Sequence, residues 1–84
     1  MKKVHVYYTF HYGRGDIRAN EADFSFDAED AVADELLEVS TPFYFDDFRR
    51  TRRQMHLAEI AYCHAIMHDY YILKIDKILK VSPE

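Results

Sequence analysis

Residues 46–69 read DDFRRTRRQMHLAEIAYCHAIMHD, and this stretch decides the fold. It contains no Gly or Pro, and its apolar residues recur at the three- and four-residue spacing of an amphipathic helix. A helix over residues 46–69 would be about 35 Å long, at a rise of about 1.5 Å per residue, which is enough to span a small domain. We therefore expect a long helix here, with the rest of the chain packed on it.

The expected helix is apolar on two sides. Counting about 100° per residue, the stripe that we expect to face the core consists of Leu57, Ile60, Ala61, His64, Met67 and Tyr71. The stripe on the opposite side consists of Phe48, Met55, Tyr62 and Ile66. A helix that covers one face of a sheet needs only the first stripe. We expect the second stripe to be covered either by a first helix and the aromatic residues 43–45, or by a second copy of the chain in a two-fold dimer.

The segment before the long helix predicts two strands and a shorter helix. Residues 3–12 alternate between two faces with β-branched and aromatic side chains, which is typical of a strand. Residues 13–16 supply a turn, and residues 17–26 return antiparallel, with a change of phase near Asn20 that a bulge or a short break would explain. A first helix is expected over residues 28–39, with Asp27 as its N-cap.

The segment after the long helix, residues 70–81, fits either a strand or a continuation of the helix. Its Ile, Tyr and Val content favours a strand, which would pair beside the first one. Asp46 or Asp47 is expected to cap the long helix. The predicted fold over residues 1–84 is thus a single α+β domain with a three-stranded antiparallel sheet, in the element order β-β-α-α-β. Both helices pack on one face of this sheet, and the long second helix is central.

Charge is distributed unevenly along a chain whose net charge is −4. Residues 1–48 contain four Lys or Arg and eleven Asp or Glu, whereas residues 49–84 contain seven and four. An acidic first helix paired with a basic second one would explain this, and the acidity of the whole chain disfavours non-specific binding to phosphate. The single cysteine, Cys63, is expected to be a buried thiol in a cytoplasmic protein, and no apolar run is long enough to cross a membrane.

Four arginines, Arg49, Arg50, Arg52 and Arg53, fall at the start of the expected helix. Cations there oppose the helix dipole, at a cost of about 0.3–1 kcal/mol each, and therefore call for anions nearby. The anions are either internal, from Asp46, Asp47 and the first helix, or external. External anions would be nucleic-acid phosphates or an acidic protein partner, to which Arg can bind with two parallel hydrogen bonds.

Two histidines are the only candidates for a metal site. His64 and His68 are four residues apart, the spacing at which two imidazoles on a helix can share a metal ion. A third ligand would have to come from the adjacent Asp69, or from His5 or His11 through the sheet, so a structural role is the expected one. We find no catalytic or phosphate-binding motif, and we expect neither an enzyme nor a cofactor.

These observations predict a non-catalytic protein-interaction or regulatory module that forms a homodimer through the second stripe, Phe48, Met55, Tyr62 and Ile66. Three alternatives remain open at this point. The first is nucleic-acid binding through the Arg49–Arg53 cluster and an open sheet face that bears His5, Tyr7, Thr9 and His11. The second is an acidic inhibitor of a nucleic-acid-handling enzyme. The third is a metal-binding protein that uses His64 and His68.

Overall fold

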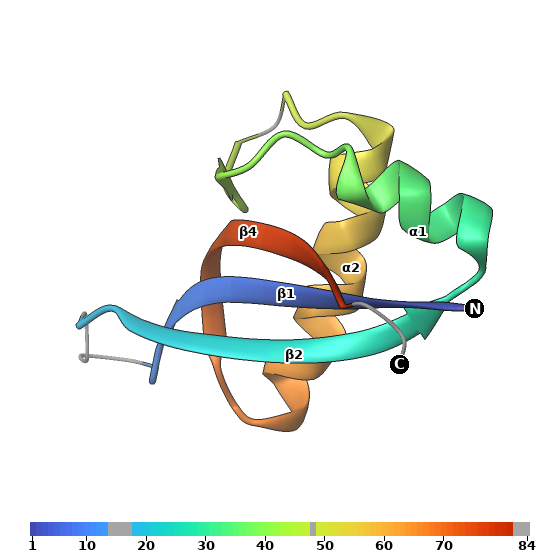
Figure 1. Cartoon of the computed structure of the whole chain (residues 1–84). Coiled ribbons are helices and arrows are strands. Elements are labelled where there is room, and N and C mark those ends of the chain that lie inside the picture. The colour runs from blue at the N-terminus through green and yellow to red at the C-terminus, as the bar shows by residue number, and fades with distance from the viewer. Residues whose placement is uncertain (14–17, 48, 82–84) are drawn as a thin grey trace.

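The computed structural model describes residues 1–13, 18–47 and 49–81, and it shows an antiparallel sheet covered by two helices (Figure 1). The elements are β1 (Lys2–His11), β2 (Asn20–Ala28), α1 (Asp30–Leu37), β3 (Phe43–Tyr44), α2 (Arg52–Met67) and β4 (Tyr71–Val81). The α+β class is confirmed. The expectation of three strands was wrong, because the sheet has four in the order β2-β1-β4-β3, and the element order is β-β-α-β-α-β.

The hairpin of β1 and β2 forms as the alternation of residue types predicts. The pairing runs without a register shift from Phe10 opposite Asn20 to Lys2 opposite Ala28. β2 begins at Asn20, where the sequence changes phase, and continues through Asp27, which therefore does not cap a helix. The turn expected at residues 13–16 lies largely outside the described residues. Gly13 has a φ of 124°, a conformation that side chains rarely adopt.

The C-terminal segment is a strand, and two bulges set which of its side chains face the core. β4 pairs antiparallel with β1, but Leu73 and Asp76 have no partner in the register. Each extra residue reverses the alternation, so Ile72, Ile75 and Ile78 all fall opposite core-facing residues of β1. The Asp76 carboxylate accepts a hydrogen bond from Thr9 Oγ1 at 2.7 Å, which satisfies the polar side chain that the bulge turns toward β1.

The fourth strand, β3, comes from the aromatic segment that we expected only to close one end of the core. Phe43 and Tyr44 pair with Ile75 and Lys74 of β4, and the Phe43 side chain is buried. β3 is short, so the outer edge of β4 is paired over only part of its length. β2, nine residues long, forms the other edge of the sheet.

Both helices are shorter than expected. α1 begins at Asp30, after Glu29, because β2 takes up residues 27 and 28. α2 begins at Arg52 rather than near Asp46, because Thr51 and Gln54 form a capping box. The Thr51 hydroxyl accepts from the Gln54 backbone N–H at 3.1 Å, and the Gln54 side chain accepts from the Thr51 N–H at 2.9 Å. α2 is therefore about 24 Å long.

The core lies between the helices and one face of the sheet. Val4, Val6, Tyr8 and Phe10 of β1 are buried together with Leu36 of α1 and with Leu57, Ala58, Ala61 and Ala65 of α2. The core stripe that we expected on α2 was partly wrong. Met67 is 81% exposed, whereas Ala58 and Ala65 are buried. The helix is thus rotated by roughly 80° from the expected orientation, toward its alanines, whose small side chains let α2 approach large residues such as Tyr8 closely.

Candidate interaction surface

The second apolar stripe of α2 lies at the surface. Met55 is 50% exposed, Tyr62 52% and Ile66 54%, and Phe48 lies outside the described residues. The first helix does not cover this stripe, and the aromatic segment after β3 covers it only in part. Phe45, held to β4 by a hydrogen bond from its backbone N–H to the Leu73 carbonyl at 2.9 Å, borders the stripe along one side.

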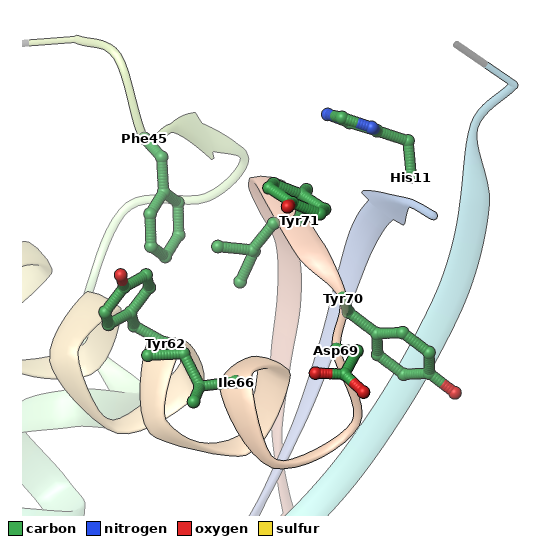
Figure 2. A pocket seen from close by; sticks show the side chains of 8 residues that line it. His11, Phe45, Tyr62, Ile66, Asp69, Tyr70 and Tyr71 are labelled. Atoms are coloured by element: carbon green, nitrogen blue, oxygen red, sulfur yellow. The ribbon is translucent and has the colours of Figure 1, made fainter. Parts of the chain in front are cut away.

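Two hollows separate Phe45 from α2. The larger has a volume of about 420 Å³ and is lined by His11, Phe45, Tyr62, Ile66, Asp69, Tyr70, Tyr71 and Ile72. Figure 2 shows the Phe45 and Tyr62 rings near each other, with Ile66 beside Tyr62 and the Tyr71 ring on the sheet side. The smaller hollow, of about 190 Å³, lies next to Met55, Glu59 and Arg50. The surface here is therefore apolar and indented.

On α2 the small side chains are buried and the large apolar ones are exposed, which is the reverse of an ordinary surface helix. Its buried residues are one leucine and three alanines, whereas its exposed side carries Met55, Tyr62 and Ile66. Single exposed apolar residues are common, whereas a row of large ones bordering an apolar hollow makes this side of α2 a candidate contact surface. The angular count along the sequence predicted this row. It did not predict Phe45, for which the only signal was its place in an aromatic run.

The four arginines do not form one cluster on the helix. Arg49 and Arg50 precede α2, and only Arg52 and Arg53 lie in its first turn. Arg49 Nε is 3.7 Å from an Asp47 carboxylate oxygen, and Arg53 Nη1 is 3.7 Å from a Glu38 carboxylate oxygen. The Arg50 guanidinium lies over the Phe45 ring, 5.7 Å from its centre. Arg52 makes no ion pair with any residue in the described part of the chain.

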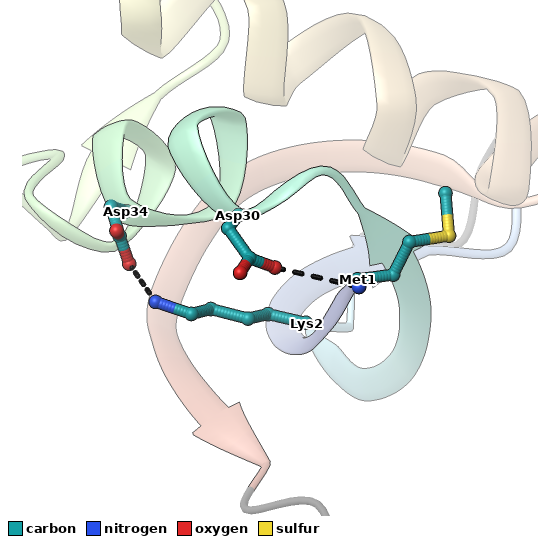
Figure 3. A network of polar contacts seen from close by, with 4 residues as sticks. All are labelled: Met1, Lys2, Asp30 and Asp34. Atoms are coloured by element: carbon teal, nitrogen blue, oxygen red, sulfur yellow. Dashed lines mark hydrogen bonds and ion pairs between the residues drawn. The ribbon is translucent and has the colours of Figure 1, made fainter.

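The carboxylates of α1 are directed mainly to the start of β1 rather than to these arginines. Lys2 Nζ is 2.8 Å from an Asp34 carboxylate oxygen, and the N-terminal ammonium is 3.4 Å from one of Asp30 (Figure 3). Hydrogen bonding to Asp34 raises the pKa of Lys2. Glu38, at the end of α1, is the one described residue of this helix region that reaches the arginines. Among the residues that the structure describes, the expected pairing of an acidic first helix with a basic second one is thus limited to one ion pair.

His64 and His68 lie side by side, and His64 is held by the core. Their ring centres are 4.6 Å apart, and the His64 ring stacks on Phe24 at 4.5 Å. His64 Nδ1 shares a 2.8 Å hydrogen bond with the hydroxyl of the buried Tyr8. Burial lowers the pKa of His64, the nearby His68 lowers it further, and Asp23 opposes both. Burial also raises the pKa of Tyr8 to about 12.

The hydrogen bond with Tyr8 occupies Nδ1 of His64, so this nitrogen already has a partner within the fold. Across residues 1–13, 18–47 and 49–81, no group of three or more His, Cys, Asp or Glu side chains is placed to hold a metal ion. The Tyr8–His64 hydrogen bond was not anticipated from the sequence. Its only signal was a histidine within an otherwise apolar stripe.

The open face of the sheet is largely occupied by contacts within the chain. The Lys77 ammonium lies 4.6 Å from the centre of the Tyr7 ring, and Lys74 lies 5.6 Å from that of Tyr44. His5 Nε2 is 2.8 Å from an Asp23 carboxylate oxygen. Of the rings on this face that could stack on a nucleic-acid base, Tyr7 is thus covered by a lysine, and the His11 ring stacks on Tyr71.

Cys63, expected to be buried, is exposed, because the rotation of α2 turns it toward solvent.

No helix in the described part of the chain is long and apolar enough to cross a membrane. Comparison of the chain with protein-family models, with curated proteins and with solved structures finds no match.

Proposed function

We propose that the protein is a small non-catalytic interaction module that forms a two-fold homodimer through the exposed side of α2. The observation that supports this most directly is the inverted size pattern of the helix. Three alanines line its buried side, while Met55, Tyr62 and Ile66 are each about half exposed. A helix with no partner would gain stability by burying its larger residues and exposing its alanines.

A second copy of the chain fits this surface for two reasons. A chain of 84 residues buries only roughly 60–65% of the surface of its unfolded state, so burial by self-association adds a large fraction to a small core. The stripe also runs along the middle of α2, and a two-fold contact between such stripes buries the same residues twice. The exposed side of α2 also carries both Arg52 and Glu59, so the surface has charges of both signs.

The proposal is tested by sedimentation equilibrium over protein concentrations of about 1–100 µM. We expect a monomer–dimer equilibrium that Ile66→Glu shifts strongly to monomer, because a carboxylate would be buried in the contact. The matched control is Leu79→Glu. Leu79 is 46% exposed, close to the 54% of Ile66, but it lies on β4 away from α2.

The control variant should dimerise like the unmodified chain, and far-UV circular dichroism should show that both variants are folded. An unmodified chain that sediments as a monomer over the whole range would refute the proposal. Equal loss of the dimer in the two variants would also count against it, because the effect would then not be specific to the stripe.

A further inference from the structure

We propose that the two copies of α2 pair antiparallel, in a register that places Arg52 of each copy opposite Asp69 of the other. This inference rests on the proposed function, because it requires the exposed side of α2 to be the dimer contact. It goes further by assigning the direction of the helices, their register and the role of the two charged residues.

A row of six exposed residues runs along this side of the helix. The row consists of Arg52, Met55, Glu59, Tyr62, Ile66 and Asp69. The intervals between them alternate between three and four residues. This is the spacing of the contact positions in two-helix coiled coils, so the five residues from Arg52 to Ile66, all within α2, form one straight seam. Asp69 lies two residues beyond the end of α2 and extends the seam, because it lines the same hollow as Tyr62 and Ile66.

The order of residue types along the seam is self-complementary in one direction only. Antiparallel pairing about a two-fold axis between residues 60 and 61 puts the first seam residue opposite the last. Arg52 then faces Asp69, and Met55 faces Ile66. At the centre, Glu59 faces Tyr62, whose hydroxyl can donate a hydrogen bond to the carboxylate. Each residue of the seam therefore faces a residue of complementary chemistry in the other copy: opposite charges at the ends, apolar side chains next to them, and a hydrogen-bonding pair at the centre.

Other arrangements of the same seam lose this match. Parallel pairing places Arg52 against Arg52 and Asp69 against Asp69, with like charges in contact at both ends. Sliding the antiparallel pair by one heptad in one direction puts Met55 opposite Glu59 and leaves Asp69 beyond the contact. Sliding it in the other direction puts Glu59 opposite Asp69. Charge and polarity therefore select one register.

The end residues of the seam are also mismatched with their own helix. Arg52 is the first residue of α2, and Asp69 follows its C-cap, His68, so each charge has the same sign as the end of the dipole it occupies. Among residues 1–13, 18–47 and 49–81, neither side chain has an ion-pair partner. In the antiparallel dimer, Asp69 lies beside the N-terminus of the second α2 and Arg52 beside its C-terminus. Both mismatches then become favourable contacts.

The apolar layer has a place to insert. Ile66, which faces Met55 of the second copy, lines the hollow of about 420 Å³ that Phe45 and Tyr62 border (Figure 2). Methionine is flexible and fills irregular apolar spaces well. We therefore expect Met55 of each copy to enter the hollow of the other.

Charge reversal in two separate chains tests the register. Arg52→Glu and Asp69→Lys should each raise the dimer dissociation constant by roughly tenfold, because each homodimer then has like charges at both ends of the seam. An equimolar mixture should form a heterodimer about as tight as the unmodified dimer. At one end of its seam the introduced glutamate would face the introduced lysine, and the other end keeps Arg52 with Asp69. The matched control is Arg53→Glu, in the same helical turn but off the seam, which should leave the dimer unchanged.

Asp69 has a φ of 58°, so its residue type also affects the backbone. Asn tolerates this conformation, and Asp69→Asn should therefore keep the fold while weakening the dimer. A dimer of unchanged affinity in Asp69→Asn would show that only the backbone conformation matters and would refute the assigned pair.

A second measurement uses a chain without charge changes. In the proposed register the Cα atoms of Cys63 in the two copies are about 10 Å apart, from the helical rise and the usual spacing of packed helices. Nitroxide labels on this single cysteine should show strong dipolar broadening in electron paramagnetic resonance. Labels much farther apart than about 20 Å would overturn the register.

The outcomes separate the two proposals. If the unmodified chain is a monomer, both fail. If Ile66→Glu abolishes the dimer but the mixture of Arg52→Glu and Asp69→Lys chains is no tighter than either alone, the surface is correct and the register is wrong.

Discussion

The hydrogen bond between Tyr8 and His64 leads to a prediction in which a second substitution restores stability that the first one removes. Tyr8 is fully buried, and its hydroxyl has His64 Nδ1 as hydrogen-bond partner at 2.8 Å. His64 is only partly buried and stacks on Phe24. Replacing His64 by Phe keeps a ring on Phe24 but leaves the Tyr8 hydroxyl buried without a partner.

The magnitudes follow from which group loses its partner. A buried hydroxyl left unsatisfied costs about 1–3 kcal/mol, so His64→Phe should lower the free energy of unfolding by about 2 kcal/mol. Tyr8→Phe should cost less, about 1 kcal/mol, because the half-buried imidazole can bind water instead. The double variant has neither polar group in the core, and it should be more stable than His64→Phe alone by about 1–2 kcal/mol.

The assay is urea unfolding of the four chains, followed by far-UV circular dichroism at one protein concentration, because dimerisation would make stability depend on concentration. Equal slopes of free energy against urea are required for the comparison. In a thermal scan, about 2 kcal/mol corresponds to a shift of roughly 8–16 °C for a domain of this size. A double variant that is less stable than His64→Phe would refute the reasoning, since it would mean that the Tyr8 hydroxyl does not depend on His64.

Three further predictions concern the same core and the start of α2. Burial holds the pKa of His64 below its usual 6.5, so the unfolded chain takes up this proton first as the pH falls. The contribution of the neutral His64 to the free energy of unfolding should be fully present above about pH 6.5 and should decline below it. The melting temperature should therefore drop less between about pH 7.5 and pH 5.5 in His64→Phe than in the unmodified chain. Thr51→Ala removes the N-cap of α2 and should cost about 1 kcal/mol in urea unfolding, whereas Ser25→Ala, at an exposed strand position, should cost little. Ala61→Leu should cost about 1–3 kcal/mol by overpacking the contact of α2 with the sheet, and the same change at the exposed Cys63 should be nearly neutral.

The parts of the fold that depend on local periodicity could be predicted from the sequence. The strict alternation around Val4, Val6 and Tyr8 marks β1, and the return strand β2 begins at Asn20, where the phase changes. The choice of a strand for residues 70–81 was also correct, because β-branched and aromatic residues dominate there, and β4 covers Tyr71–Val81. In each case many residues contribute to one signal.

The predictions that were wrong concern features that depend on single residues or on tertiary contacts. The start of α2 is decided by Thr51 and Gln54, whose capping box competes with the cap expected at Asp46 or Asp47. β3 consists of two residues, and it is a strand only because its backbone pairs with the edge of β4. The rotation of α2 toward its alanines reflects how closely the helix can approach Tyr8, and periodicity alone does not report such a distance.

The candidate interaction surface could likewise be predicted only in part from the sequence. The row of Met55, Tyr62 and Ile66 could be read from the sequence, because helical angles depend only on numbering. The neighbouring Phe45 could not, because its position depends on the hydrogen bond of its backbone to β4. The place of Arg52 at the end of the row could not either, because it depends on where α2 begins. With the boundaries of α2 known, the part of the seam from Arg52 to Ile66 can be recognised by its three- and four-residue intervals alone.

The acidic bias of the first half of the chain has a consequence at the edge of the sheet. β2 is nine residues long and regularly paired, and its outer side is not joined to another strand within the described part of the chain. Such an edge can template fibril growth by strand addition. Glu21, Asp23 and Asp27 point to the open face of the sheet, so a second β2 laid alongside would bring carboxylates against carboxylates. The same residues that give the chain its negative charge thus disfavour the addition of a second β2 at this edge.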